Sequence, residues 1–292
     1  MQNTLSKNSI KGVFVPLVTP MRYGEFDKES MAQLMQSIEQ YVDGYVPCLS
    51  TGEGNVLTND QWYEVVSFVR SMTDKPVIAG IKRDSKNEII ELAKKAKELG
   101  CDSFITPVPS NNWEETRNHF IEISESTNLP FMVYNTEAAN ISSVEHLMEL
   151  DQLESVIALK DSSLNTQFFT EACNLRAENR VGLSVLQGME HLLEVPEGCD
   201  GYLVSMANIE PELIRSMYEN PSKEINYRIL QKFMEYNLGA EWYVSLKALL
   251  YYKGIIRSSE QVQQFVHLEN EVVQEIRELK QWKNIEYTIP RR

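Results

Sequence analysis

Residues 76–107 read PVIAGIKRDSKNEIIELAKKAKELGCDSFITP, and this stretch decides the fold. Its two ends, residues 76–80 and 102–107, are short apolar runs of the kind that form buried strands. Between them, apolar residues recur at the spacing of one helix face: Ile89, Leu92, Ala93, Ala96 and Leu99. A strand, an amphipathic helix and a second strand in this order predict a parallel βαβ unit.

The same alternation extends along the chain in both directions. Helical segments separate eight candidate strands, which cover residues 12–19, 45–50, 76–80, 102–107, 130–135, 155–160, 183–187 and 201–205. Eight such units in one stretch fit a closed barrel better than an open sheet. We therefore predict an α/β protein, a (β/α)₈ TIM barrel over residues 1–222.

The strand signals end near Pro221. Helical periodicity continues instead over residues 224–236, 241–252 and 260–282. No Pro-rich or low-complexity linker separates this part from the barrel. We predict that residues 223–292 are a C-terminal helical region that packs on the barrel.

Composition narrows the classes of partner. The chain has 28 basic and 42 acidic residues, a formal charge of −14, which repels nucleic-acid phosphates and anionic membranes alike. No run approaches the roughly 20 apolar residues of a membrane span. The four cysteines form no CxxC pair, and no histidine lies at zinc-site spacing, which argues against a disulfide framework and a metal. A cytoplasmic protein without nucleic-acid or membrane partners is expected.

The chemistry of such a barrel lies at the carboxyl ends of its strands. Lys160 directly follows the apolar residues 156–159, and a cation at this position loses hydration, which favours the neutral, nucleophilic amine. Alternatively, Lys160 extends from the strand end into solvent or pairs with Asp161. Its position alone does not separate these interpretations.

Two further strand ends carry polar groups. The turn Ser50-Thr51-Gly52-Glu53 follows a buried strand, and its amides and hydroxyls suit a small carboxylate. Tyr134 can transfer protons if a hydroxyl orients it, and Ser50 is the candidate. Taken alone, Tyr134 is as well explained as a packing aromatic residue.

These motifs occur together in one order. Ser-Thr-Gly-Glu at 50–53, Tyr-Asn at 134–135 and Leu-Lys-Asp-Ser-Ser at 159–163 resemble the dihydrodipicolinate synthase and N-acetylneuraminate lyase superfamily. The segments GVFVPLVTP at 12–20 and PVIAG at 76–80 match the same family's first and third strands. The resemblance extends from about residue 10 into the C-terminal helices.

The resemblance implies a mechanism and site residues. Lys160 would form an imine with pyruvate or a related 2-oxo acid, so no separate cofactor and no metal are implied. Ser50 and Thr51 would hold the carboxylate, Tyr134 would shuttle protons, and Gly188 would line the imine pocket. The same motifs supply three more substrate-binding residues: Gly52, Asn135 and Ser162. Family members commonly form homotetramers, built as dimers of dimers, so a homo-oligomer is expected.

The chain also departs from the family's synthases. Their relay tyrosine follows strand four, where this chain reads Thr-Pro-Val-Pro at 106–109. They carry an arginine shortly after the Tyr-Asn pair, where this chain has Glu137 and no arginine. A lysine-pathway synthase is therefore not expected. Lys82 and Arg83 replace small residues after strand three, and they would meet an anionic group of a different substrate, unless they are solvated surface cations.

The leading hypothesis is a Schiff-base lyase or aldolase that acts on a 2-oxo acid, either pyruvate or a 2-keto-3-deoxy sugar acid. One alternative is a dehydratase that uses the same lysine imine on a deoxy-keto sugar acid. Another is a non-catalytic paralogue that binds a metabolite. The first two require Lys160 as the nucleophile, whereas the third does not.

Overall fold

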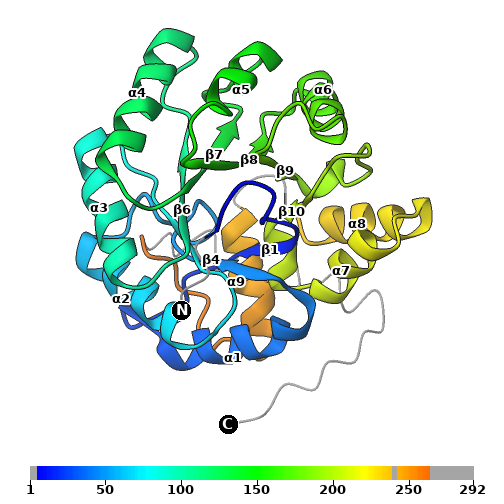
Figure 1. The fold of residues 1–292 in the computed structure, drawn as a ribbon. Coiled ribbons are helices and arrows are strands. Elements are labelled where there is room, and N and C mark those ends of the chain that lie inside the picture. The colour runs from blue at the N-terminus through cyan, green and yellow to red at the C-terminus, as the bar shows by residue number, and fades with distance from the viewer. Residues whose placement is uncertain (1–4, 239–241, 264–292) are drawn as a thin grey trace.

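The computed structural model describes residues 5–238 and 242–263, in which eight parallel strands form a barrel (Figure 1). Their order is β4-β1-β10-β9-β8-β7-β6-β5. The strands are β1 (Gly12–Pro16), β4 (Gly44–Val46), β5 (Ile78–Gly80), β6 (Ser103–Pro107), β7 (Phe131–Thr136), β8 (Val156–Ser162), β9 (Ser184–Gln187) and β10 (Gly201–Leu203). A parallel bridge between Tyr45 and Val77 closes the ring. The predicted (β/α)₈ barrel is confirmed.

Helices surround the strands on the outside of the barrel (Figure 1). They are α1 (Lys28–Ile38), α2 (Asn59–Ser71), α3 (Lys86–Glu98), α4 (Trp113–Ser126), α5 (Val144–Leu150), α6 (Thr166–Ala177) and α7 (Pro211–Glu219). Short 3₁₀ turns add η1 (Glu39–Tyr41), η2 (Glu190–Leu192) and η3 (Ser205–Asn208). Polar side chains define several helix starts. Thr58, for example, forms a reciprocal capping box with Gln61 at the start of α2.

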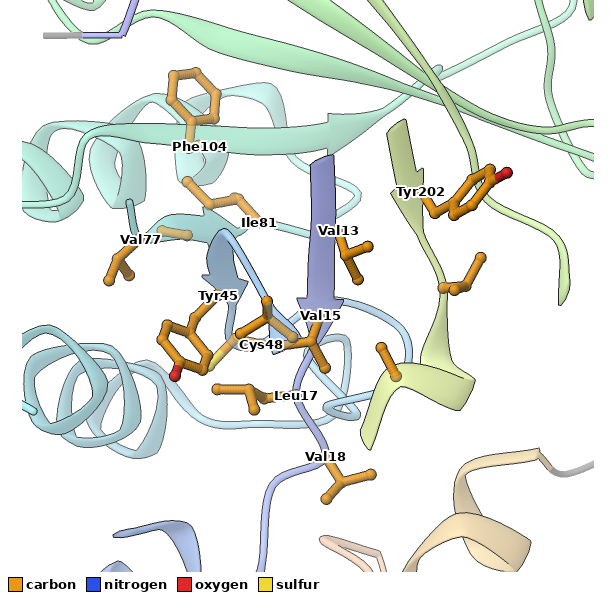
Figure 2. Packing of buried hydrophobic residues seen from close by; sticks show 14 of the residues in the cluster. Val13, Val15, Leu17, Val18, Tyr45, Cys48, Val77, Ile81, Phe104 and Tyr202 are labelled. Atoms are coloured by element: carbon orange, nitrogen blue, oxygen red, sulfur yellow. The ribbon is translucent and has the colours of Figure 1, made fainter. Parts of the chain in front are cut away.

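The strands separate two hydrophobic cores because successive side chains point to opposite faces. The barrel interior contains Phe14, Val46, Ile78, Ile105, Met132, Ile157, Ala158, Leu186 and Leu203. The neighbours Ile157 and Ala158 both belong to it because the β7–β8 register shifts at Ile157. Figure 2 shows part of the outer core, between strands and helices, with Val13, Val15, Tyr45 and Phe104. Ala158 faces inward and Leu159 outward, so Lys160 faces inward. Tyr134 pairs with Lys160 in the β7–β8 register and shares its side of the sheet.

The second strand is shorter than the predicted 45–50. Strand β4 ends at Val46, and a turn over residues 47–56 follows it. Cys48 adopts a left-handed φ of 60° there, and the Gly80 amide donates to the Pro47 carbonyl at 2.8 Å. A Cβ on Gly80 would lie 2.4 Å from the Leu49 nitrogen, so glycine permits this close approach. The turn is thereby packed directly against β5.

The C-terminal part contains α8 (Lys223–Glu235) and α9 (Trp242–Tyr252), as predicted. Helix α8 contacts α7 and η2, and α9 contacts η3. The boundary between residues 222 and 223 stays a prediction. Within the described ranges, no helix has both the length and the apolar character that crossing a membrane requires.

The third C-terminal helix was predicted over 260–282, and residues 264–282 lie outside the described part of the chain. Its predicted start is wrong. Glu260 bridges to Met21 in a small hairpin formed by β2 (Met21–Arg22) and β3 (Glu25–Phe26). The Glu260 carboxylate accepts hydrogen bonds from the Tyr23 and Gly24 amides, both at 3.1 Å. These tertiary contacts override the helical pattern of the segment.

Candidate active site

A cavity of about 830 Å³ opens at the carboxyl ends of the strands. Ten residues were expected to take part in catalysis or substrate binding, and eight of them line this cavity: Ser50, Thr51, Lys82, Arg83, Tyr134, Lys160, Ser162 and Gly188. The remaining two, Gly52 and Asn135, are not part of the wall. Residues at the carboxyl ends of five strands therefore line one cavity, as the barrel fold predicts.

Lys160 is the central cation of this cavity. The residue is only 4% exposed, and its Nζ lies 4.1 Å from the centroid of the Tyr134 ring. Across residues 5–238 and 242–263, no carboxylate forms an ion pair with it. Asp161 faces away and accepts hydrogen bonds from Asn135 Nδ2 at 2.7 Å and Ser163 Oγ at 3.0 Å. The structure thus does not pair Lys160 with Asp161, and the amine faces the cavity.

Tyr134 is electrostatically coupled to its surroundings. Burial raises the pKa of its phenol, but the positive charge of Lys160 and a hydrogen bond from Ser50 act in the opposite direction. The charge of Lys82 adds to the lowering. The net result is a pKa below the ordinary tyrosine value, which suits a group that must give and take protons near neutral pH.

The turn over residues 50–53 has the properties of a carboxylate site. Its Ser50 and Thr51 side chains line the cavity, and in the described part of the chain their backbone amides donate to no protein acceptor. Glu53 anchors the turn instead of entering the cavity. Its carboxylate forms a buried ion pair with Lys247 of α9 and accepts the Val262 amide at 2.7 Å. Two adjacent amides and the Thr51 hydroxyl are thus available for an anion, whereas the Ser50 hydroxyl donates to Tyr134.

Gly188 is needed because Lys160 occupies the space beside it. A Cβ at Gly188 would lie 2.6 Å from Lys160 Cε and 2.2 Å from Ser162 Oγ. The Gly188 amide donates to the Asp161 carbonyl at 2.7 Å, which holds the glycine against β8. The buried Ser162 hydroxyl has no hydrogen-bond partner among the described residues, so a ligand on Lys160 would satisfy it.

The predicted residues outside the wall have other contacts. Asn135 bonds Asp161 and also the Ile141 amide and carbonyl, so its side-chain groups are all engaged. Gly52 packs on backbone, since a Cβ there would lie 2.8 Å from the Leu17 carbonyl oxygen. The structure therefore gives both residues a supporting position and does not bring them to the cavity.

Lys82 and Arg83 are adjacent, but they differ in their contacts. The Arg83 guanidinium donates to the carbonyl oxygens of Gly54 and Leu57 and pairs with Glu88 at 2.9 Å. It therefore holds the turn from residue 54 onward, although it borders the cavity. Lys82 has no ion-pair partner in the described ranges, and its amine is the one available to an anionic ligand.

Several cavity residues were not predicted. Glu190 and Ser205 follow β9 and β10, and Glu190 Oε1 accepts hydrogen bonds from the Ser205 amide and hydroxyl. The strand-end rule could have found them, because they lie at or beside the predicted strand ends. Trp242 of α9, with Phe233 and Leu238, forms another part of the wall. No local signal marks these three, because helix packing brings them there.

No cluster of three or more potential metal ligands occurs within residues 5–238 and 242–263. The chemistry that the cavity residues support is that of a buried amine. A buried amine, a phenol of lowered pKa and a turn with two free backbone amides surround one cavity. This combination suits a carbonyl compound that carries a carboxylate next to its reactive carbon.

Comparison with known proteins agrees with this architecture. The model of the dihydrodipicolinate synthetase family matches residues 9–282. A 4-hydroxy-tetrahydrodipicolinate synthase of Geobacter sulfurreducens is 30% identical over 217 residues, which are 71% of this chain and 74% of that protein.

Solved structures have the same fold. A monomeric dihydrodipicolinate synthase variant superposes with a TM-score of 0.84 at 23% identity, over 95% of this chain and 98% of its own. A 2-keto 3-deoxygluconate aldolase from Picrophilus torridus gives 0.74 at 25% identity, over 84% and 94%. The family match covers nearly the whole barrel and much of the C-terminal part. This chain therefore belongs to the dihydrodipicolinate synthetase family and is an enzyme of the class I aldolase-type lyases.

Proposed function

We propose that this enzyme forms an imine between Lys160 and a 2-oxo acid and makes or breaks the carbon–carbon bond next to that imine. The observation that carries the proposal is the Lys160 amine, which is buried, has no carboxylate partner among the described residues and lies against Tyr134. Residues 50 and 51 line the same cavity, and their free amides would receive the substrate carboxylate.

The reaction begins when the neutral Lys160 amine attacks C2 of the substrate. The ammonium proton of the adduct passes through Tyr134 to the C2 oxygen, and Tyr134 then donates its own proton to the resulting hydroxyl. Water leaves, and the products are an iminium and the Tyr134 phenolate. In the cleavage direction, the Tyr134 phenolate takes the proton of the C4 hydroxyl, and the C3–C4 electron pair forms an enamine as the aldehyde leaves. Protonation at C3 and addition of water then release pyruvate and restore the amine.

Borohydride trapping tests the proposal directly. The protein is incubated with pyruvate, reduced and weighed intact, and the modified peptide is identified. We expect one reduced adduct per chain, on the peptide that contains Lys160. An unmodified protein, or an adduct on another lysine, would overturn the imine assignment.

The substrate that we propose is a 2-keto-3-deoxy sugar acid, and a lysine-pathway aldehyde is not favoured. Val108 lines the cavity where the synthases carry their relay tyrosine. Glu137 lines it near the position of their carboxylate-binding arginine, and its charge would repel a carboxylate. Within a cavity of about 830 Å³, a six-carbon chain has ample room.

An assay on a panel of 2-keto-3-deoxy sugar acids separates an aldolase from a dehydratase. An aldolase releases pyruvate, which a coupled assay detects, whereas a dehydratase consumes the substrate without releasing pyruvate.

A homo-oligomer and a cytoplasmic location stay predictions. Light scattering checks the former, since one similar structure is of a variant described as monomeric.

Lys82 is proposed to bind a second anionic group of the substrate. We expect Lys82→Met to raise the half-saturating concentration of a 6-phosphate or 6-carboxylate sugar acid about tenfold, because one charged hydrogen bond is lost. The half-saturating concentrations of pyruvate and of 2-keto-3-deoxygluconate, whose tail is uncharged, should change little, although loss of the Lys82 charge raises the pKa of Tyr134 and slows proton transfer for every ligand. Lys82→Arg should retain most of the affinity. Equal weakening of all the ligands would contradict this role.

Tyr134→Phe is expected to slow imine formation at neutral pH about 100-fold, because the variant lacks the proton-transfer group. The lowered pKa gives a second readout. The chain has 13 tyrosines, so a wild-type minus variant ultraviolet difference titration is needed to isolate this one. The isolated tyrosinate signal should appear below the ordinary tyrosine range. A signal in or above that range would contradict the electrostatic coupling.

A further inference from the structure

The C-terminal helices contribute a polar contact to the carboxylate turn. The indole Nε1 of Trp242, the first residue of α9, donates a hydrogen bond to Thr51 Oγ1 at 3.3 Å. Both side chains line the cavity that contains Lys160. Thr51 is almost fully buried, with 4% of its surface exposed.

This contact constrains the hydroxyl proton of Thr51. A hydroxyl has one proton to donate and two lone pairs that accept. Because the indole donates into one lone pair, the hydroxyl proton must point away from Trp242. In the described part of the chain, no protein oxygen accepts that proton, and the side chain borders the cavity. The proton is therefore free for a ligand oxygen.

The turn itself is held by a different contact. Glu53 pairs with Lys247 and accepts the Val262 amide, so the backbone of the turn is anchored two residues beyond Thr51. Loss of the Trp242 indole would leave this anchor in place. The hydrogen bond from Trp242 thus acts on the direction of one hydroxyl, and Glu53 supplies a separate anchor for the turn.

We infer that Trp242 is a positioning residue for substrate recognition: it orients the Thr51 hydroxyl so that its proton is donated to the carboxylate of the 2-oxo acid. The inference rests on the proposed function, because it requires the carboxylate to bind at residues 50–51. It makes a residue of the C-terminal helices part of the specificity of the barrel site.

Two ketones test this role. Borohydride trapping is measured against concentration with pyruvate and with acetone, which has the same reactive carbonyl but no carboxylate. Trp242→Phe should raise the half-saturating pyruvate concentration about five- to tenfold. A change of this size is expected because part of the free energy of the hydrogen bond to the carboxylate depends on the orientation of the hydroxyl. The half-saturating acetone concentration should change less than that of pyruvate, because acetone has no carboxylate to accept the Thr51 proton. A loss shared equally by both ketones, or no loss for pyruvate, would overturn the inference.

A double-mutant cycle separates the hydroxyl from other effects of the indole. In a Thr51→Val background, Trp242→Phe should weaken pyruvate binding no further, and an additive loss would contradict the inference.

Trp242→His keeps a ring N–H and should recover part of the affinity. It is the second variant if Trp242→Phe does not fold. Trp113→Phe is the matched control, since Trp113 stacks on His146 outside the cavity wall. If wild-type protein forms no pyruvate adduct, the proposed function fails, and this outcome is distinct from any of the above.

Discussion

Lys160→Ala should abolish the reducible pyruvate adduct and lower turnover at least about 1,000-fold, because the proposed nucleophile is removed. Truncation leaves a space in a cavity that is already open to ligands, so the fold should persist. Intact mass after borohydride reduction and a coupled pyruvate assay measure the two effects. A melting curve close to that of the wild type shows that the loss is chemical.

Lys253 provides the matched control for this experiment. Burial lowers the pKa of the Lys253 amine, which makes it the rival nucleophile if desolvation alone decided the reaction. However, it bonds the Ile209 carbonyl at 2.9 Å and does not line the cavity. Lys253→Met should therefore still form the adduct. If the adduct disappears in Lys253→Met and remains in Lys160→Ala, the imine forms on Lys253, and the assignment to Lys160 is wrong.

Gly188→Ala should reduce the rate of imine formation at least about 100-fold, because displacement of a reacting group by about 1 Å has effects of that size. The new methyl would lie 2.6 Å from Lys160 Cε and 2.8 Å from the Asp161 carbonyl, which is backbone and moves little. Overpacking of this kind also destabilises a fold by about 1–3 kcal/mol. The trapping rate and a denaturant titration measure the two consequences separately.

Gly182→Ala is the control for an added methyl group at a glycine that does not line the cavity. Its nearest neighbour would be Lys7 Cδ at 3.2 Å, a flexible side chain that can shift. Imine formation should be unaffected in this variant. Equal loss in both glycine variants would show that the Gly188 effect is general destabilisation and has no local steric cause.

The barrel was predictable because its signals are local. Each strand is a short apolar run, and each helix has one apolar face, so periodicity alone gave their order. Lys160, Tyr134 and Gly188 were predictable for the same reason, as they lie at strand ends. Asn135 directly follows Tyr134, and strand alternation places it on the opposite face. That placement could have been inferred from the sequence, whereas the motif alone suggested substrate contact.

Other features depend on contacts between distant segments. The Glu260 carboxylate binds a hairpin more than 200 residues earlier, and a helical pattern carries no sign of it. Trp242 reaches Thr51 only because α9 packs over the barrel mouth. Lys82 and Arg83 are neighbours in sequence, yet only the Arg83 guanidinium donates hydrogen bonds to the carbonyl oxygens of the nearby turn. Long-range packing decides such assignments, and single-sequence patterns do not contain it.

The strand order has a mechanical consequence. The ring closes between β4 and β5, where Tyr45 and Val77 form an isolated bridge, and β8 stands four strands away from β4. A substrate with its carboxylate at the turn after β4 and a covalent bond to β8 would act as a strut across the barrel mouth. Because such a substrate can bind only when the ring of strands is closed, its binding free energy stabilises the closed ring. Occupancy would thus stiffen the weakest seam of the scaffold, and the empty enzyme would be its most deformable state.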